Sequence, residues 1–556
     1  MTDILICSNP AALPESVARR WSWIVAGRIG FRQSPSWRWA AIHRGPQTLL
    51  LVGLCRGRRQ RRRPTDLQTV AADLMADDEP PFARPHRWLG PIAGVWHHRD
   101  DGSFRVFRDR FGRLPLQCLD LKPGRLITSC PDTIASLSQA RPHRRALQSF
   151  VHRPLDTESQ DLFCDLQRLR PAEAIDLDGP TERRRFRWWH PRRRPLGDAT
   201  ASLRGLLHRM GDALGPCPHI LALSSGLDSS TLALEATSRH PRSLAYTLCD
   251  PQSIRDEGPA ARRTARELGL NWHRFGIGDH PPFRRLSDLG LPLAWGPTAH
   301  PDPAWKIPWH RHLRRRHPSY PLVYGNGADE ALTLTPGDRS RSPLVSWRRA
   351  AQSLLPSPVE QSLKKLLRPS SPPWLQPHRW YPSPPDSPWP KRDRLAFLMA
   401  QLWSWRWERV VRSLAAEARR AQRPIWTPFL DAEFWNLSLS MNAHDLGNGV
   451  RPKSVLRRTM ASRLPHHCLH RWSQGGFDAV VERGLLHFAP PYLHRWFHHC
   501  RLQQVEPNFR PAIFRRAFDA YRHAEIAPGS GDIRGSWPIW RTLAAEYWLQ
   551  RLYRDG

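Results

Sequence analysis

One short segment carries residue types that could bind phosphate. It reads SSGLDSS over residues 224–230, between an apolar run expected to form a strand (219–224) and an alanine- and leucine-rich run expected to form a helix (229–239). A helix N-terminus has unpaired N–H groups and partial positive charge, so a strand that turns directly into a helix creates an anion site. Hydroxyl donors come from its serines, Ser224, Ser225, Ser229 and Ser230.

Gly226 and Asp228 refine this interpretation. Gly226 lets the backbone approach a ligand closely. Asp228 would repel a phosphate, so its presence makes sense if Mg²⁺ lies between the carboxylate and the phosphates. Other phosphate-binding loops are excluded, since the chain has neither G-x-x-x-x-G-K-[ST] nor a G-x-G-x-x-G after a strand. The alternative is an ordinary helix with a serine-rich N-cap.

The surrounding residues predict strands alternating with helices. An amphipathic helix is expected near 201–214, a strand at 243–249, a helix at 257–268, and another apolar run with polar residues after it, YGNGADEAL (324–332). This alternation is typical of a parallel sheet with crossover helices. Ligands of such sheets bind at the carboxyl ends of the strands, which would bring Asp228 and Asp329 together.

These motifs resemble a known family. LSSGLDSS is similar to the pyrophosphate-binding SGGxDSS loop of the ATP pyrophosphatase superfamily, and YGNGADEAL resembles the SGxGADE segment of asparagine synthetases. TPFLDAEFWNLSLSMN (427–442), RPKSVLRRTMASRLP (451–465) and RWSQGGFDA (471–479) resemble later segments of that family in the same order. The resemblance implies an α/β domain over 200–556, of the adenine-nucleotide α-hydrolase type, with a Pro-rich insertion at 354–393.

The N-terminal part reads as short strands and turns up to a linker near 187–200. LGPIAGVW, FRDRFGRLPLQC and LFCDLQRLRPAEAIDLDG resemble landmarks of the glutaminase domain of the same family. We therefore expect an α+β, layered, glutaminase-like (Ntn-type) domain over 1–190. Active glutaminases need a Cys at the new N-terminus, whereas position 2 is Thr2 and Cys7 is internal. The domain is expected to make no ammonia, although Thr2 with its own amine is a conceivable nucleophile.

The synthetase motifs also depart from the family. Asn326 replaces an acidic or tyrosine residue and cannot act as a base. The family lysine that steadies the adenylate falls near Ser473 or Gln474, so Lys453 or Arg471 would have to supply that charge. These departures argue against asparagine synthesis, and the resemblance then implies a macrolactam synthetase of lasso-peptide biosynthesis.

The resemblance assigns the following roles. ATP and Mg²⁺ are the expected cofactors, with Asp228 and Asp329 as metal ligands and as catalytic residues together with Lys453 and Arg471. The nucleotide is expected to contact Leu223, Ser224, Ser225, Gly226, Asp228, Ser229, Ser230, Thr247, Gly325 and Asn326. A side-chain carboxylate of a precursor peptide would be adenylated and then attacked by the N-terminal amine of the same peptide, releasing AMP and pyrophosphate. The base for that amine is left open among Glu330, Glu408 and Glu417.

Composition limits the remaining options. The formal net charge is +34, carried mostly by Arg scattered through every segment of the 556 residues. Scattered charge and the absence of an RNA-binding motif argue against a nucleic-acid partner. Nine dispersed cysteines, no signal peptide and no long apolar run predict a cytoplasmic protein with reduced thiols and no membrane partner.

The expected partners are the precursor peptide, a leader-peptide protease and a leader-recognition protein. Two other functions stay open: an asparagine-synthetase-like or β-lactam-synthetase-like amide ligase acting on a small molecule, and an RNA-modifying adenylating enzyme.

Overall fold

The structure is a computed structural model. It describes residues 3–7, 22–24, 29–32, 38–45, 47–53, 56–57, 68, 71–72, 88–89, 92–100, 102–121, 124–130, 141–152, 161–178, 181–215, 217–289, 292–334, 393–447, 452–471, 476–523 and 537–553. Thr2, Ser473, Gln474 and nearly all of the Pro-rich insertion 354–393 lie outside these ranges.

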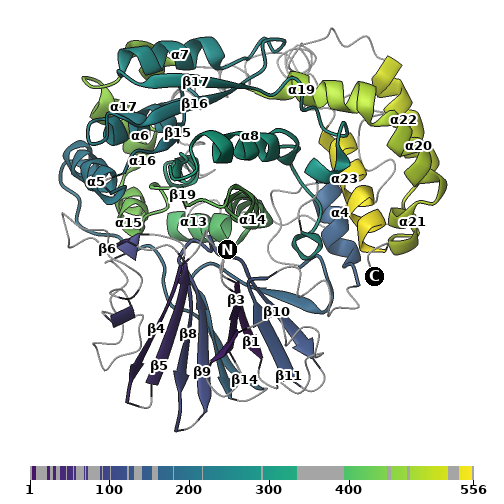
Figure 1. Ribbon diagram of the computed structural model, residues 1–556, viewed down its shortest axis with the longest axis horizontal. Helices are drawn as coiled ribbons and strands as arrows, with labels where there is room; N and C mark the ends of the chain where they lie inside the picture. Colours follow the sequence, from purple (N-terminus) through teal and green to yellow (C-terminus); the bar gives the residue numbers. More distant parts are fainter. Residues whose placement is uncertain are drawn as a thin grey trace, which may run out of the picture.

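Two antiparallel sheets form the N-terminal part (Figure 1). One has the order β12 (Leu166–Leu169), β10 (Leu116–Leu121), β11 (Gly124–Thr128), β1 (Asp3–Cys7), β3 (Ile29–Arg32), β2 (Ser22–Ile24). The other has the order β14 (Thr181–Arg187), β13 (Glu173–Asp178), β9 (Ser103–Arg108), β8 (Ile92–His98), β5 (Gln47–Gly53), β4 (Arg38–Arg44). A separate short pair joins β6 (Arg56–Gly57) and β7 (Trp88–Leu89).

The two large sheets share a core. Val95 and Val106 of one sheet and Leu119 and Ile127 of the other belong to a single buried apolar cluster. Side chains alternate along each strand, and because Leu119 pairs with Leu126 and Ile127 with Cys118, Leu119 and Ile127 lie on opposite faces of their sheet, both of which are buried. The expected layered, sheet-rich N-terminal part is therefore observed. Its helix α4 (Arg144–His152) packs against the C-terminal helix α23 (Trp537–Leu552). An Arg144–Glu506 ion pair of 2.8 Å also joins α4 to the residue that follows α21 (Arg501–Val505).

A parallel sheet forms the centre of the C-terminal part, as the sequence predicts. Its order is β17 (Asn271–Gly276), β16 (Leu244–Cys249), β15 (Ile220–Ala222), β18 (Leu322–Val323), β19 (Ile425–Trp426). Ile220 and Leu221 are buried in different apolar clusters, so both faces of β15 are covered. Strand order reverses between β15 and β18, and ligands of open parallel sheets bind at such a switch point.

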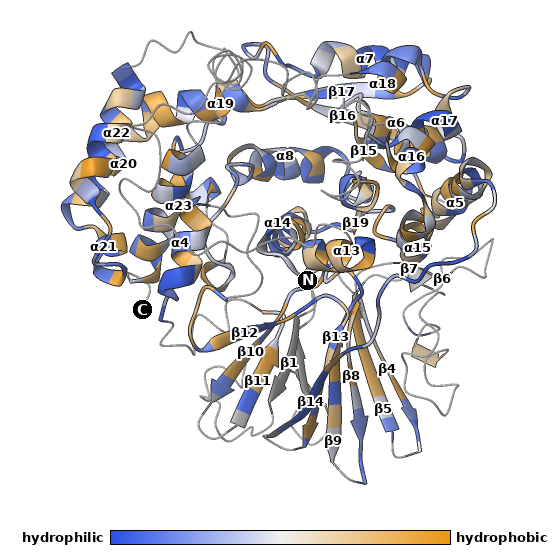
Figure 2. Ribbon diagram, turned by 180° about the vertical axis from the view of Figure 1, so that it is seen from behind, coloured by the Kyte–Doolittle hydropathy of each residue, from blue (hydrophilic) through white to orange (hydrophobic). Residues whose placement is uncertain are grey.

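Helices cover this sheet, and a last group of helices stands apart from it beside α4 (Figures 1 and 2). The first group comprises α5 (Ala199–Ala213), α6 (Leu227–Thr237), α7 (Gly258–Glu267), α8 (Pro303–Arg316) and the single turn α9 (Ala328–Ala331). The second comprises α13 (Arg394–Trp403), α14 (Trp405–Ala421), α15 (Ala432–Ser440), α16 (Ala443–Leu446), α17 (Ser454–Met460) and α18 (His466–His470). The last comprises α19 (Asp478–Arg483), η7 (Gly484–Phe488), α20 (Pro490–His498), α21 (Arg501–Val505), α22 (Pro511–His523) and α23.

Buried contacts join the N-terminal sheets to the helices. The guanidinium of Arg108 in β9 lies 3.0 Å from the carboxylate of Glu408 in α14, and both side chains are almost completely buried. The predicted linker is also packed, since Trp189 is buried beside the ring of Phe111. Because buried charges are tolerated only when paired, the Arg108–Glu408 contact holds the two parts in one arrangement.

Candidate active site at the carboxyl ends of β15 and β18

The serine-rich loop follows β15 directly. Helix α6 begins at Leu227, two residues earlier than the sequence predicts, with Gly226 as its N-cap. Ser225 has a left-handed φ of 52°, which turns the chain sharply from strand to helix. The Ser224 and Ser229 hydroxyls lie 3.0 Å apart, and Ser229 donates to the Gly226 carbonyl at 3.1 Å. The loop therefore presents the first turn of α6 together with two paired hydroxyls.

Two other serines of the loop face the protein interior. Ser230 is fully buried, and its hydroxyl contacts the Cys468 sulfur at 3.6 Å. Ser225 is also fully buried, and its hydroxyl accepts a hydrogen bond from Arg471. The prediction that all four serines contact the nucleotide stays a prediction; in this structure the Ser225 and Ser230 hydroxyls contact Arg471 and Cys468 in the interior.

Arg471 forms contacts that hold the serine-rich loop in place. Its guanidinium donates to the Ser224 carbonyl at 2.7 Å and lies 3.4 Å from the Glu257 carboxylate. The expected cation near the loop is thus present, although it is bound to the backbone of the loop. No local pattern indicates Glu257, because its pairing with Arg471 joins segments far apart in the chain.

The second loop, between β18 and α9, lies against the first. A Cβ atom on Gly325 would be 3.5 Å from the Asp228 Cβ and 3.6 Å from the Ser229 nitrogen. Gly327 has φ +104°, and a Cβ there would come within 2.4 Å of Leu430. Gly327 therefore permits the left-handed turn that precedes Asp329 and its close packing on Leu430, whereas Gly325 lies at ordinary van der Waals distance from the serine-rich loop.

Lys453 joins the two loops. Its ammonium contacts the Asp228 carboxylate and lies 2.7 Å from the Asp329 carboxylate. Lys453 itself has a left-handed φ of 61° at the N-cap of α17. Backbone strain of this kind is concentrated at functional sites, where the surrounding structure enforces it. The sequence-based expectation that Asp228, Asp329 and Lys453 share one site agrees with this placement.

Burial and neighbouring charge set the protonation of these groups. Burial raises the pKa of Asp228, and the nearby Asp329 carboxylate adds to that effect while Lys453 opposes it. Burial lowers the pKa of Lys453, but the two carboxylates outweigh it and leave the lysine pKa raised. The lysine therefore remains charged and offsets two negative charges that would otherwise repel each other.

The residues present fit a magnesium ion bound together with phosphates. One Asp228 oxygen, Oδ1, is buried without a hydrogen-bond partner among the described residues. Mg²⁺ is commonly held by one or two carboxylates plus substrate phosphates, and this site supplies two. Asp228 and Asp329 would hold such an ion, which would neutralise charge on the phosphates.

Thr247 and Leu223, expected to flank the adenine, lie on adjacent strands. The Thr247 hydroxyl donates to the Leu223 carbonyl at 2.8 Å and accepts from the Trp272 indole at 3.0 Å. These two hydrogen bonds hold Leu223, Thr247 and Trp272 in place beside the serine-rich loop, and they already engage the Thr247 hydroxyl as both donor and acceptor.

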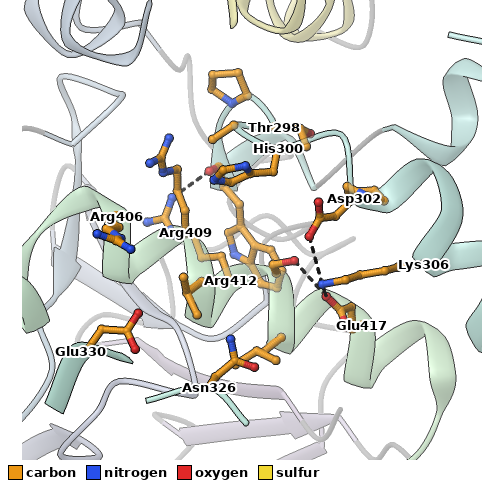
Figure 3. Close-up of a pocket in the computed structure, with 17 residues that line it drawn as sticks. Thr298, His300, Asp302, Lys306, Asn326, Glu330, Arg406, Arg409, Arg412 and Glu417 are labelled. Atoms are coloured by element: carbon orange, nitrogen blue, oxygen red, sulfur yellow. Dashed lines mark hydrogen bonds and ion pairs between the residues drawn. The ribbon is translucent and has the colours of Figure 1, made fainter. Parts of the chain in front are cut away.

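A pocket of about 210 Å³ borders the second loop (Figure 3). Asn326 and Glu330 form one side, and residues of α8, of α14 and of the segment 295–302 before α8 form the others. The three glutamates considered as bases for the substrate amine differ in how their carboxylates are paired. Glu408 is paired with Arg108 and Arg412, and Glu417 is bound by Lys306, His310 and Tyr324. Half-buried Glu330 faces the pocket, and burial raises its pKa, so it is the candidate best able to take a proton.

Two comparisons with known proteins bear on this site. A family model described as asparagine synthase matches residues 217–550, which is more than half of the chain. A search among curated proteins found no significant match. No helix within the described ranges has both the length and the apolar character needed to cross a bilayer.

Proposed function

This chain belongs to the asparagine synthase family, a family of ATP-dependent amide ligases, and from that premise we propose that it is an AMP-forming macrolactam synthetase. Its substrate is a precursor peptide. An Asp or Glu side chain of the peptide is adenylated and then joined to the peptide's N-terminal amine, as in lasso-peptide biosynthesis.

The proposal rests mainly on one observation: Asp228 and Asp329, from two different loops, converge on the Lys453 ammonium beside the N-terminus of α6. A phosphate chain placed there would meet the helix N–H groups and the Ser224 and Ser229 hydroxyls. The convergence of cation, carboxylates and helix N-terminus supports binding of the β- and γ-phosphates, with the α-phosphate toward the pocket.

The reaction has two balanced steps. A carboxylate oxygen attacks the α-phosphorus of ATP, the bond to the β-phosphate oxygen breaks, and pyrophosphate leaves. The peptide amine then attacks the acyl carbon, AMP leaves, and the amine proton passes to a base, for which Glu330 is the best placed of the three glutamates. The protein contributes orientation and neutralisation of charge, and it must exclude water because an acyl adenylate hydrolyses readily.

An amine of the substrate itself is the proposed nucleophile. With Thr2 at the position where glutaminases need Cys, we propose that the N-terminal sheets form a glutaminase-like domain that supplies no ammonia. Asn326 lies in the pocket lining and cannot serve as a base. The leader-peptide protease and leader-recognition protein remain proposed partners on the same grounds.

Product analysis tests the proposal. The protein is incubated with ATP, Mg²⁺ and one of three candidates: a precursor peptide, a small amino acid with free ammonia, or tRNA. The expected result is AMP and pyrophosphate with the peptide, which loses one water as its ring closes. Release of ADP contradicts the proposal. Pyrophosphate release only with the small acid, or only with tRNA, would instead favour a small-molecule ligase or an RNA-modifying enzyme.

A matched pair of aspartate variants locates the chemistry. Asp228→Ala is expected to abolish pyrophosphate release while the protein stays folded, because the site loses a buried carboxylate at the phosphate end. Asp279→Ala, at an exposed aspartate, is expected to behave as the wild type. Retained cyclisation in Asp228→Ala would refute the assigned role of Asp228.

A further inference from the structure

The parallel sheet ends on one side in an exposed strand, β17. It is the outermost strand of that sheet (Figure 1), and within the described part of the chain it pairs with β16 alone. All six of its residues are at least partly exposed, and Asn271, Arg274 and Gly276 are the most exposed. An edge strand of this kind presents backbone N–H and C=O groups that can pair with another extended chain.

The direction of the backbone shows which groups are available. Ile277, directly after β17, donates its N–H to the Cys249 carbonyl at 2.9 Å, so its backbone faces β16. Successive residues of a strand direct these groups alternately to one side and to the other. Trp272, Arg274 and Gly276 therefore direct their N–H and C=O groups away from β16, where no described residue pairs with them.

Helices cover both faces of β17 and leave its edge. Trp272 points to the α7 face, where the Arg262 guanidinium lies 5.9 Å from the centre of its ring. Phe275 points to the opposite face, and its ring lies 5.5 Å from the His312 ring of α8. Because both faces are occupied, the outer edge of β17 suits an extended strand better than a helix or a broad protein surface.

Positive charge surrounds this edge. Arg274 lies on the strand itself, Arg262 lies on α7, and Arg316 is the last residue of α8. Burial and, after it, the charge of Arg316 lower the pKa of His273, which places Arg316 near the strand. In the described ranges, none of the three arginines lies within ion-pair distance of a carboxylate. A second copy of this chain would bring the same charges to the edge, so the edge favours an acidic strand.

We propose that the outer edge of β17 binds an extended, acidic segment of the substrate peptide, which adds to the sheet as a further strand. Main-chain hydrogen bonds would supply affinity, and the arginines would select carboxylates. The identification of the segment as part of the precursor peptide rests on the proposed function. A phosphate backbone, by contrast, offers acceptors but no N–H donors for the exposed carbonyl groups, so a peptide is favoured over RNA.

The docked segment would lie within reach of the candidate active site. A strand added to β17 is three strand spacings, or about 14 Å, from β15, and five extended residues span about 17 Å. The residues that react beside the serine-rich loop can therefore belong to the same peptide as the docked segment. Docking would hold the peptide near the site while its other end reacts.

The binding test uses three short peptides of equal length, with the full chain and no nucleotide. One peptide alternates glutamate with threonine, one alternates lysine with threonine, and one alternates glutamate with proline. The first is expected to bind at least about tenfold more tightly than either of the others, because lysine reverses the charge and proline removes N–H donors. Arg274→Glu should remove the preference for glutamate over lysine, whereas Arg204→Glu, at an exposed arginine of α5, should retain it.

Hydrogen exchange locates the bound strand. The amides of Trp272, Arg274 and Gly276 should gain protection when the glutamate–threonine peptide binds, and those of β19, at the other edge of the same sheet, should not. Equal binding of the proline peptide, or no added protection in β17, would overturn the proposal. A dimer of this chain that the peptide dissociates, or tighter binding of a single-stranded RNA at the same amides, would overturn it as well.

Activity measurements separate this inference from the proposed function. In the cyclisation reaction, Arg274→Glu should raise the KM for the precursor peptide and leave the KM for MgATP and the melting temperature unchanged. An unchanged KM for the peptide would contradict docking of the substrate at β17. Absence of cyclisation by the wild type, with the β17 amides still protected by the acidic peptide, would count against the proposed function and leave the docking edge standing.

Discussion

Replacing Lys453 by Met tests how the site is held together. The side chains of Lys453 and Asp228 are 11% and 16% exposed, whereas that of Asp329 is 61% exposed. Removing one partner of a fully buried ion pair costs about 3–5 kcal/mol of stability, whereas an exposed ion pair contributes about 0–1 kcal/mol. Because this cluster is partly exposed, we expect Lys453→Met to cost about 2–4 kcal/mol, nearly all of it from the lost pair with Asp228.

Double-mutant cycles show how much of that free energy comes from the Lys453–Asp228 pair and how much from the Lys453–Asp329 pair. Asp228→Asn in the Lys453→Met background should recover most of the loss, with a coupling of about 2–3 kcal/mol, while Asp329→Asn should show less than about 1 kcal/mol. The measurement is the opening free energy of the α6 backbone amides by native-state hydrogen exchange, which reports this region without requiring the whole chain to unfold in one step.

The pH dependence of Lys453→Met has a defined sign. Without the ammonium, burial and Asp329 raise the Asp228 pKa further above its ordinary value of 3.8. A carboxyl with a raised folded pKa contributes stability that is present below the unfolded pKa and lost as pH rises through the folded pKa. The cost of Lys453→Met should therefore be smaller at acid pH than at neutral pH. A cost independent of pH, or equal coupling for both aspartates, would refute the reasoning.

Three further predictions concern other parts of the chain. Burial opposes ionisation of Glu408, but its arginine neighbours outweigh burial and lower its pKa from 4.5 to about 2. The stability that the ionised carboxylate contributes to the folded protein is therefore complete above about pH 4.5 and lost as pH falls toward 2. Glu408→Gln should cost about 3–5 kcal/mol at neutral pH and flatten the acid limb of thermal unfolding, and an unchanged acid limb would contradict this. Gly327→Ala should abolish pyrophosphate release, because the left-handed φ and the contact with Leu430 leave no room for a Cβ, whereas Gly197→Ala, in open space, should be neutral. Thr2→Ala should leave cyclisation unchanged, and a large loss would indicate a live N-terminal nucleophile.

Local pattern in the sequence was enough for the serine-rich loop. Ser224 and Gly226 follow a short apolar run and precede an alanine- and leucine-rich run, and this order of small and apolar residues already specifies a strand, a turn and a helix. The parallel sheet followed from the same alternation of strands and helices. The meeting of Asp228 with Asp329 followed from the rule that parallel strands end at one edge.

Tertiary packing decided what those residues touch. The residue pattern of α6 could not show that Ser230 contacts Cys468 or that Arg471 binds the backbone of the serine-rich loop, because these contacts join segments more than 200 residues apart. The arginines of the pocket gave no signal either. Arg406 and Arg409 look like ordinary surface residues of an amphipathic helix until α8, α9 and α23 are packed around them. The sequence by itself thus determined which elements form and where phosphate chemistry is possible, since these depend on local residue order. Only the tertiary structure decided which charges balance each other, because that depends on which distant segments share a buried space.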